Sequence, residues 1–292
     1  MTTVKNYLSL IKFSHTIFAM PFAIIGFFLA SLPPTSLHLE RKEISWKIFF
    51  LVILCMVFAR SAAMAFNRWA DTTYDKENER TKIREIPNGV ISSKNALIFV
   101  IINCVLFITS TFFINKICFY LSPLALLVIL GYSYTKRFTP LCHLVLGLGL
   151  SLAPIGAFLA VTGEFKLLPL LYSFVVFFWV SGFDIIYSLQ DEEFDRAKNL
   201  KSIPVLIGKK NALLSARILH IISGSFILVA GYFGEFNIWY YIGAGIFITL
   251  LIYQHTLVKS NDLSKVNLAF FTTNGIASVV FAAFFLVELY LS

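Results

Sequence analysis

The chain has 292 residues, of which 58% are hydrophobic, 16% aromatic and only 14% charged, and its mean hydropathy is +0.79. Soluble globular chains are about 45–50% apolar and about 25% charged, so this composition excludes a soluble fold as well as disordered, collagen-like and disulfide-stabilised chains. A net charge of +8 would suggest nucleic acid as the partner of a soluble protein, but in a membrane protein it first indicates cytoplasmic loops. We therefore expect a polytopic membrane protein without a nucleic-acid partner.

Long runs without a charged residue mark the candidate spans, because crossing the hydrocarbon core needs about 20 mostly apolar residues, within a range of about 17–25. Eight such runs occur, and a ninth span is interrupted by Arg60. In chain order the predicted spans are 13–39, 46–66, 95–115, 117–135, 138–163, 167–183, 218–234, 236–258 and 266–287. The first is longer than the apolar core of a signal peptide, about 7–15 residues, so we expect it to be retained.

The distribution of basic residues predicts the orientation. With the N-terminus placed in the cytoplasm, 18 of the 24 Lys and Arg residues fall on the cytoplasmic side and five on the opposite side, with Arg60 inside a span. This bias favours a cytoplasmic N-terminus and a C-terminus outside, which agrees with an odd number of spans.

The sparse acidic residues include two clusters, each at the cytoplasmic end of a predicted span. In the first cluster, Asn67, Asp71 and Asp75 are spaced i, i+4 and i+8, so their oxygens share one face if the helix of the second span runs on. The second cluster follows the sixth span, at spacings of 3, 4 and 4, and consists of Asp184, Tyr187, Asp191 and Asp195.

Carboxylates at i and i+4 repel each other, so two helices that carry such pairs at one depth need a cation between them. Hard oxygen ligands favour Mg²⁺, which usually binds one or two carboxylates together with substrate phosphate oxygens. The two clusters therefore predict a magnesium–diphosphate site, and the alternative is a pair of solvated helix ends balanced by Lys and Arg. Asp184 follows 17 uncharged residues and is a candidate site residue for that reason, although an ion pair with Arg60 would also explain it.

Basic, hydroxyl-bearing loops follow both clusters. The first contains Arg80-Thr81 and the second Lys201-Ser202, and each continues to an Ile-Pro pair and a glycine. This repetition predicts one domain made of two pseudo-repeats, about 1–140 and 141–292, with a ligand site between them. The basic side chains would neutralise a leaving diphosphate or would simply belong to positive-inside loops. Lys136 and Arg137 are either an interfacial anchor or further ligands.

These residues resemble the signature of the UbiA superfamily of intramembrane aromatic prenyltransferases. The matching segments are Asn67–Asp75, Arg80-Thr81-x-x-Arg84, Asp191–Asp195, Lys201-Ser202, Tyr132 with Lys136 and Arg137, and Thr16–Phe22. Two departures occur, since Arg68 stands where the family usually has an acid, and Glu-Ile-Pro follows Arg84. Both resemble a branch of 4-hydroxybenzoate polyprenyltransferases that includes enzymes suspected of prenylating naphthoates for menaquinone by the futalosine route.

The resemblance implies an all-α polytopic membrane protein: a bundle of nine transmembrane helices with a central cavity opening to the cytoplasmic side, in a bacterial inner membrane. It implies transfer of a polyprenyl group from polyprenyl diphosphate to the ring of 4-hydroxybenzoate, ortho to the phenol, in ubiquinone biosynthesis, or to a dihydroxynaphthoate for menaquinone. The partners are then the two substrates and membrane lipid, with no obligate protein partner evident.

The resemblance also implies roles for individual residues. The expected Mg²⁺ ligands are Asn67, Asp71, Asp75, Asp191 and Asp195, and the four aspartates among them are the expected catalytic residues. Residues expected to assist at the diphosphate are Arg80, Lys136, Arg137 and Lys201. Arg60, Arg68 or Arg137 is expected to bind the acceptor carboxylate, and Asp184 or Tyr187 to tune deprotonation of the ring.

Two other classes of protein remain open at this point. A secondary transporter would carry acids near mid-span on broken helices, whereas only Asp184 and Arg60 fall inside predicted spans here. A non-catalytic membrane scaffold would have no need of duplicated aspartate pairs.

Overall fold

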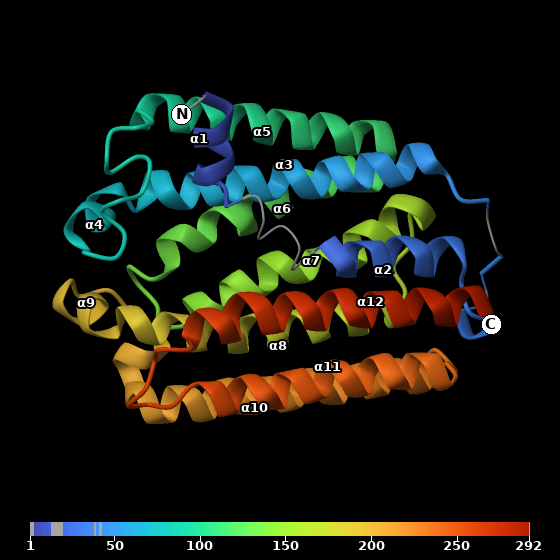
Figure 1. Ribbon diagram of the computed structural model, residues 1–292. Coiled ribbons are helices and arrows are strands. Elements are labelled where there is room, and N and C mark those ends of the chain that lie inside the picture. Colours follow the sequence, from blue (N-terminus) through green and yellow to red (C-terminus); the bar gives the residue numbers. More distant parts are fainter. Residues whose placement is uncertain (1–2, 13–19, 38, 41–42, 292) are drawn as a thin grey trace.

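The computed structural model describes residues 3–12, 20–37, 39–40 and 43–291, and the regular structure within them is helical. Long helices run side by side along one direction (Figure 1). The α-helices are α1 Thr3–Leu10, α2 Met20–Ser31, α3 Trp46–Ala70, α4 Thr72–Glu77, α5 Ser93–Ile114, α6 Lys116–Thr135, α7 Cys142–Thr162, α8 Leu167–Ser188, α9 Glu192–Ala197, α10 Ile203–Phe233, α11 Ile238–Leu257 and α12 Asn274–Leu291. Short 3₁₀ turns cover Thr35–Leu37 and Leu189–Asp191, and a π-helix covers Leu268–Thr273.

The prediction of an all-helical membrane protein is confirmed. Eight helical segments in the described ranges are long and apolar enough to cross a membrane, and they contain α3, α5, α6, α7, α8, α10, α11 and α12. The count of nine is not confirmed. The predicted span 13–39 includes α2, which has only 12 residues, while 13–19 and 38 lie outside the described residues, as does the start of the motif Thr16–Phe22.

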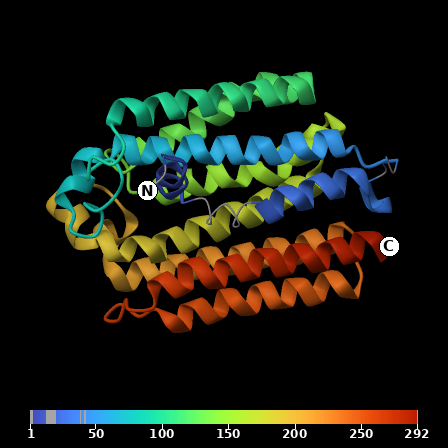
Figure 2. The ribbon, with the colours of Figure 1, turned by 45° about the horizontal axis from the view of Figure 1, so that its top comes forward.

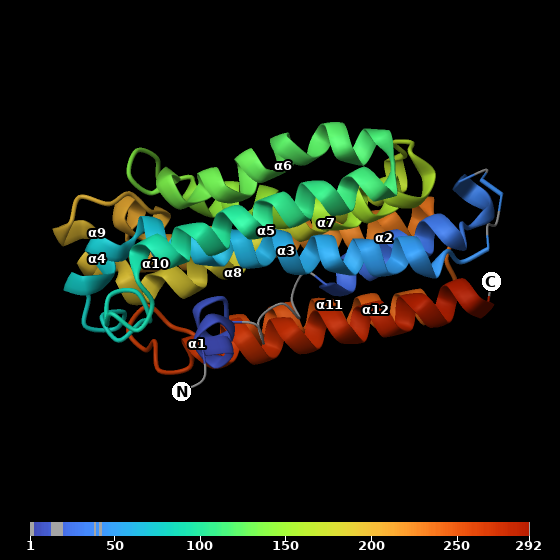
Figure 3. The same cartoon turned by 90° about the horizontal axis from the view of Figure 1, so that it is seen from above.

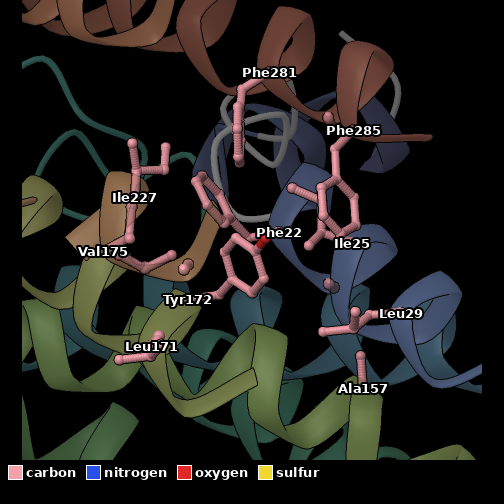
Figure 4. Packing of buried hydrophobic residues seen from close by; sticks show 14 of the residues in the cluster. Phe22, Ile25, Leu29, Ala157, Leu171, Tyr172, Val175, Ile227, Phe281 and Phe285 are labelled. Atoms are coloured by element: carbon pink, nitrogen blue, oxygen red, sulfur yellow. The ribbon is translucent and has the colours of Figure 1, made fainter. Parts of the chain in front are cut away.

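The helix α2 is nevertheless part of the core, because ten of its 12 residues are buried. Its Phe22 ring lies among rings of α8, α11 and α12, with centroids 5.5 Å from Trp179, 6.3 Å from Phe247 and 6.0 Å from Phe281. Figure 4 shows the same packing around Phe22 and Tyr172. Such tilted and edge-on aromatic contacts are the favoured geometries for rings. They tie the N-terminal part of the chain to its C-terminal helices.

The helices that carry the acidic clusters end together. The short helices α4 and α9, which follow α3 and α8, lie at the same end of the bundle, and the C-terminus of α12 lies at the opposite end (Figures 1, 2 and 3). An ion pair between Glu77 and Lys198 joins the two short helices' ends. Acids 120 positions apart in the sequence are therefore brought to one end of the molecule.

Two details of the helix pattern correct the sequence-based expectation. The helix of the second span does not run through its acidic cluster, because Asp71 adopts φ −93° and ψ 8° between α3 and α4. The segment between the predicted spans 167–183 and 218–234 is not a plain polar connection, because it contains the start of α10. That helix begins at Ile203, where the Ser202 hydroxyl accepts from Val205 N, and it is kinked at Gly208, whose φ of +78° suits glycine.

Close packing of α2 on α7 makes a test of the fold. A Cβ atom on Gly26 would lie 2.1 Å from the backbone oxygen of Pro154, whereas a Cβ on Gly245 of α11 would meet nothing within 4 Å. We expect Gly26→Ala to destabilise the detergent-solubilised protein by about 1–3 kcal/mol, because a backbone carbonyl cannot move aside cheaply. The measurement is the denaturation midpoint by circular dichroism. Gly245→Ala is the control and should leave the midpoint unchanged or raise it; equal midpoints for both variants would contradict this packing.

Candidate active site

The first acidic cluster is neutralised by the segment that follows α6. Asp71, with its side chain 5% exposed, has Lys136 Nζ 2.9 Å from Oδ2 and Arg137 Nη2 3.6 Å from Oδ1. Asn67 Nδ2 also faces Oδ2, at 3.4 Å. Burial lowers the pKa of Lys136, but the neighbouring Asp71 carboxylate outweighs this and holds that pKa above its ordinary value. Lys136 is therefore a permanent positive charge beside Asp71.

Arg137 has a second attachment besides Asp71. Its Nη2 donates to the backbone oxygen of Ala70 at 2.7 Å, and its guanidinium lies over the rings of Tyr74 and Tyr134, at 5.5 and 4.6 Å. It thus satisfies one of the carbonyls left open at the C-terminal end of α3. The pair Lys136-Arg137 belongs to the acidic cluster and does not act only as an interfacial anchor.

Asp75 is held by its own loop. Arg84 Nη1 donates to both carboxylate oxygens, at 2.7 and 2.9 Å, and the Thr81 hydroxyl donates to the Asp75 backbone oxygen at 3.2 Å. Arg84 belongs to the Arg-Thr-x-x-Arg motif but is not one of the site residues predicted from the sequence. It lies nine positions after Asp75 in a loop that folds back, and helix periodicity cannot predict such a contact.

Asp191 receives its partners from the first half of the chain. Arg80 Nε donates to Oδ1 at 3.1 Å and Arg80 Nη2 to Oδ2, while Arg80 Nη1 donates to the Tyr187 hydroxyl at 3.0 Å. Asn78 Nδ2, which the sequence analysis did not single out, lies 3.4 Å from Asp191 Oδ1. The loop after α4 is thereby attached to the end of α8.

Asp195 is the least neutralised of the four aspartates. It is 8% exposed, and it takes part in none of the ion pairs found across the described ranges. Lys136, Asp191 and Asp71 all lie within electrostatic range of it. The two aspartate pairs therefore form one connected electrostatic group with Lys136 among them.

Two arginines of α3 each have a buried nitrogen that lacks a hydrogen-bond partner in the part of the chain that the structure describes: Arg60 Nε and Arg68 Nη1. Arg60 lines a cavity of about 530 Å³ between α3, α5, α6 and α7, together with Tyr132 and mostly apolar side chains. Arg68 lies within electrostatic range of Asp75, Arg84 and Glu85. The predicted central position of a cavity and its opening to the cytoplasmic side stay predictions.

Asp184 and Lys201, the remaining predicted site residues, have partners other than those expected. Asp184 pairs with His143, a residue that the sequence analysis missed, and it does not pair with Arg60; the distance from His143 Nδ1 to Asp184 Oδ2 is 2.7 Å. Lys201 lies apart from the carboxylates, since its Nζ donates to the backbone oxygen of Phe138 at 3.2 Å. His143 lies 41 positions before Asp184 in the sequence, so no helix or motif spacing predicts that the two side chains pair.

The donor set suits Mg²⁺ but is not arranged as a finished metal site. No group of three or more His, Cys, Asp or Glu side chains is placed to hold one ion within residues 3–12, 20–37, 39–40 and 43–291. Three of the four aspartates instead face Lys or Arg. Oδ1 of Asp71 is buried without a hydrogen-bond partner in those ranges, so a hard oxygen remains available. Carboxylates that already have cations fit an ion that arrives with phosphate oxygens of its own.

Comparison with known proteins gives matches over almost the whole chain. The UbiA prenyltransferase family matches residues 19–285. A 4-hydroxybenzoate octaprenyltransferase of Coxiella burnetii (strain CbuK_Q154) is 28% identical over 284 residues, which are 95% of this chain and 94% of that protein. One from Nitrosomonas eutropha (strain DSM 101675 / C91 / Nm57) is 29% identical over 239 residues, 82% of this chain and 83% of that protein.

Solved structures agree in fold. The apo structure of a UbiA homolog from Aeropyrum pernix K1 superposes with a TM-score of 0.83 at 29% identity, over 94% of this chain and 98% of that one. The structure of a UbiA homolog from Archaeoglobus fulgidus bound to GPP and Mg²⁺ has a TM-score of 0.72 at 20% identity, over 98% and 99%.

The pairing of Asp75 with Arg84 makes a testable contribution to stability. The Asp75 side chain is 8% exposed, so Arg84→Ala leaves a buried carboxylate without its cation, and we expect a loss of about 3 kcal/mol. The measurement is chemical denaturation in detergent. Lys82→Ala is the control, since its pair with Glu79 has side chains 48% and 86% exposed and should contribute less than about 1 kcal/mol. Similar losses in the two variants would show that Asp75 does not depend on Arg84.

Proposed function

Because the chain belongs to the UbiA prenyltransferase family, we propose that it transfers a polyprenyl group from polyprenyl diphosphate to the ring of 4-hydroxybenzoate, ortho to the phenol, with Mg²⁺. The observation that carries the proposal is the junction of two aspartate pairs and their basic partners at one end of an apolar bundle. The names of the relatives from Coxiella burnetii and Nitrosomonas eutropha support the acceptor.

Asp71, Asp75, Asp191 and Asp195, with the Asn67 amide oxygen, would hold Mg²⁺ on the diphosphate. When bound, the ion neutralises the charge that develops on the leaving diphosphate. The homolog bound to GPP and Mg²⁺ supports both ligands. Arg80 and Lys136 neutralise the aspartates in the described structure, and they turn to the diphosphate oxygens when the aspartates take the ion.

The proposed reaction needs little covalent help from the protein. The bond between the prenyl C1 and the diphosphate oxygen breaks, the allylic cation is attacked by the ring carbon ortho to the phenol, and that carbon then loses its proton. Basic side chains stabilise the leaving group, and an apolar surrounding keeps water from quenching the cation. Aromatic faces near the acids, such as that of Tyr187, whose ring centroid lies 4.2 Å from that of Phe270, also favour a cation.

The acceptor carboxylate requires a buried cation, and Arg60 suits this role. It lines the cavity, its Nε has no partner in the described ranges, and Tyr132 lies on the same cavity wall. A phenol-bearing acid bound there would reach from the cavity toward the acids at the end of α3. Arg68 and Arg137 are less suited, because Arg68 does not line the cavity and Arg137 is held by Ala70.

A dihydroxynaphthoate is the second candidate acceptor, and one observation favours it. Arg68 replaces an acid that the family usually carries, and its Nη1 is buried without a partner in the described part of the chain. An additional buried cation suits a larger acceptor with another oxygen substituent. A secondary transporter has no support from the family match.

We also propose that the acidic end faces the cytoplasm of a bacterial inner membrane, with the C-terminus outside. The support is that the basic loops after both clusters lie at one end of the bundle and α12 ends at the other. The order of long helix, aspartates and short helix occurs in both 1–140 and 141–292, which supports the two pseudo-repeats.

The direct test is Mg-dependent prenyl transfer in detergent from a prenyl diphosphate to 4-hydroxybenzoate and to 1,4-dihydroxy-6-naphthoate, followed by product chromatography. Asp71→Asn and Asp191→Asn should each lower turnover by more than about 100-fold, because each removes a carboxylate from the proposed ion. Asp262→Asn, on an exposed turn, is the control and should keep full activity. Activity in both site variants would refute the metal assignment, and a folded wild type that prenylates no aromatic acid would refute the enzyme.

The role of Arg60 has a separate test. Arg60→Leu should raise the KM for the aromatic acid by about 10–100-fold, the usual worth of a hydrogen-bonded charge, and leave the KM for prenyl diphosphate within about threefold. Steady-state kinetics with each substrate varied in turn measure both values. Arg217→Leu on α10, which lies outside the cavity lining, serves as the comparison. An unchanged acceptor KM in Arg60→Leu would assign the carboxylate to another cation.

A further inference from the structure

His143 is buried at the beginning of α7, with its side chain 3% exposed, and both of its ring nitrogens are used. Nδ1 lies 2.7 Å from Asp184 Oδ2 of α8, and Nε2 accepts from the backbone N–H of Ile203, the first residue of α10, at 3.4 Å. One side chain therefore links the beginnings or ends of three helices.

The backbone partner determines the form of the imidazole ring. An amide N–H can only donate, so the contact with Ile203 suits a ring whose Nε2 carries no proton and whose Nδ1 proton is donated to Asp184. We therefore expect a neutral ring protonated on Nδ1. A buried histidine orienting a carboxylate through one nitrogen while the other is fixed by the backbone is an arrangement used to hold a functional group in one geometry.

The surroundings of His143 connect it to the candidate site. The segment before α10 is attached to the connection between α6 and α7, because Lys201 N donates to the backbone oxygen of Lys136 at 2.6 Å and Cys142 Sγ lies 3.7 Å from the Lys201 oxygen. The side chain of Lys136 in turn pairs with Asp71. His143 is the second residue of α7, directly after this connection.

Asp184 connects the pair to the cavity through Tyr132. Its side chain is 21% exposed, and it lies within electrostatic range of Tyr132, which lines the cavity together with Arg60. Asp184 itself is not among the lining residues, so its orientation would act on a bound acceptor through the field at this wall of the cavity.

We propose that His143 is a positioning residue for the acceptor: its imidazole fixes the orientation of the Asp184 carboxylate and anchors the start of α10. The proposal rests on the proposed prenyl transfer. It assigns to His143 no contact with either substrate, and its effect passes through Asp184.

The first test is spectroscopic and does not use the reaction. Selective ¹⁵N labelling of histidine in the detergent-solubilised full chain, with His143→Asn to assign the signal, should show a neutral ring protonated on Nδ1. An imidazolium, or a ring protonated on Nε2, would overturn the arrangement.

The second test uses kinetics with 4-hydroxybenzoate. His143→Leu removes both hydrogen bonds and should raise the acceptor KM and lower kcat, together reducing kcat/KM by about 10–100-fold, while the KM for prenyl diphosphate stays within about threefold. A smaller amount of folded protein would lower the apparent kcat but change neither KM, so the acceptor KM separates the positioning role from a loss of folding. His143→Asn retains an amide that can donate to Asp184 and should recover most of the loss. His255→Asn, whose histidine bonds to His220 on the far helices, is the matched control and should behave as the wild type.

A double-mutant cycle decides whether His143 acts through Asp184. Asp184→Leu should cost as much as His143→Leu or more, and adding His143→Leu to it should change kcat/KM by less than about threefold, because residues that act as a unit are not additive. Additive losses, or a folded His143→Leu protein with the wild-type acceptor KM, would overturn the positioning role alone. A wild type that prenylates no aromatic acid would instead overturn the proposed function, and this inference with it.

Discussion

Charge neutralisation among buried aspartates is the constraint on which this end of the molecule depends. Asp71 and Asp75 are each at most 8% exposed in their side chains, and carboxylates in that position are costly unless a cation or hydrogen-bond donor accompanies each. The chain meets this requirement with residues that are distant in sequence. Lys136 comes from after α6, and Arg80 comes from the loop after α4 to reach Asp191. The contact between Arg80 and Asp191 therefore also joins the two halves of the bundle.

The exchange of partners gives the site its chemistry. Because lysine and arginine neutralise the aspartates, the resting site carries little excess negative charge with which to attract a bare divalent ion. In the proposed function, a diphosphate would supply oxygens for the ion and a new partner for each displaced cation, so metal and substrate would bind as one set. The cavity beside Arg60 and the His143–Asp184 pair would then concern the other substrate. Donor and acceptor would be served by separate groups along α3 and α8.

Much of this arrangement follows from the sequence, because span placement depends on local composition. Charge-free runs locate seven of the eight candidate spans in the described ranges, the span interrupted by Arg60 is the eighth, and the family is recognised from motifs that lie at helix ends. The remainder depends on long-range packing. Hydropathy cannot show that α10 begins at Ile203, since Lys209 and Lys210 interrupt the apolar run, although Ser202 and Pro204 are ordinary helix-start residues. Periodicity likewise cannot reveal that His143 lies against Asp184, or that Arg84 turns back to Asp75.

The attachment of Arg137 to the last turn of α3 distinguishes two kinds of charge beside Asp71. The Arg137 guanidinium is fixed, because it closes the carbonyl of Ala70 and lies between two tyrosine rings. The Lys136 ammonium pairs with Asp71 from a flexible stem, which in the proposed reaction would let it follow an incoming phosphate. The Arg137 charge would then stay with the helix end while its neighbour in the sequence moves, so the break in α3 would keep one positive charge in place where the leaving group departs.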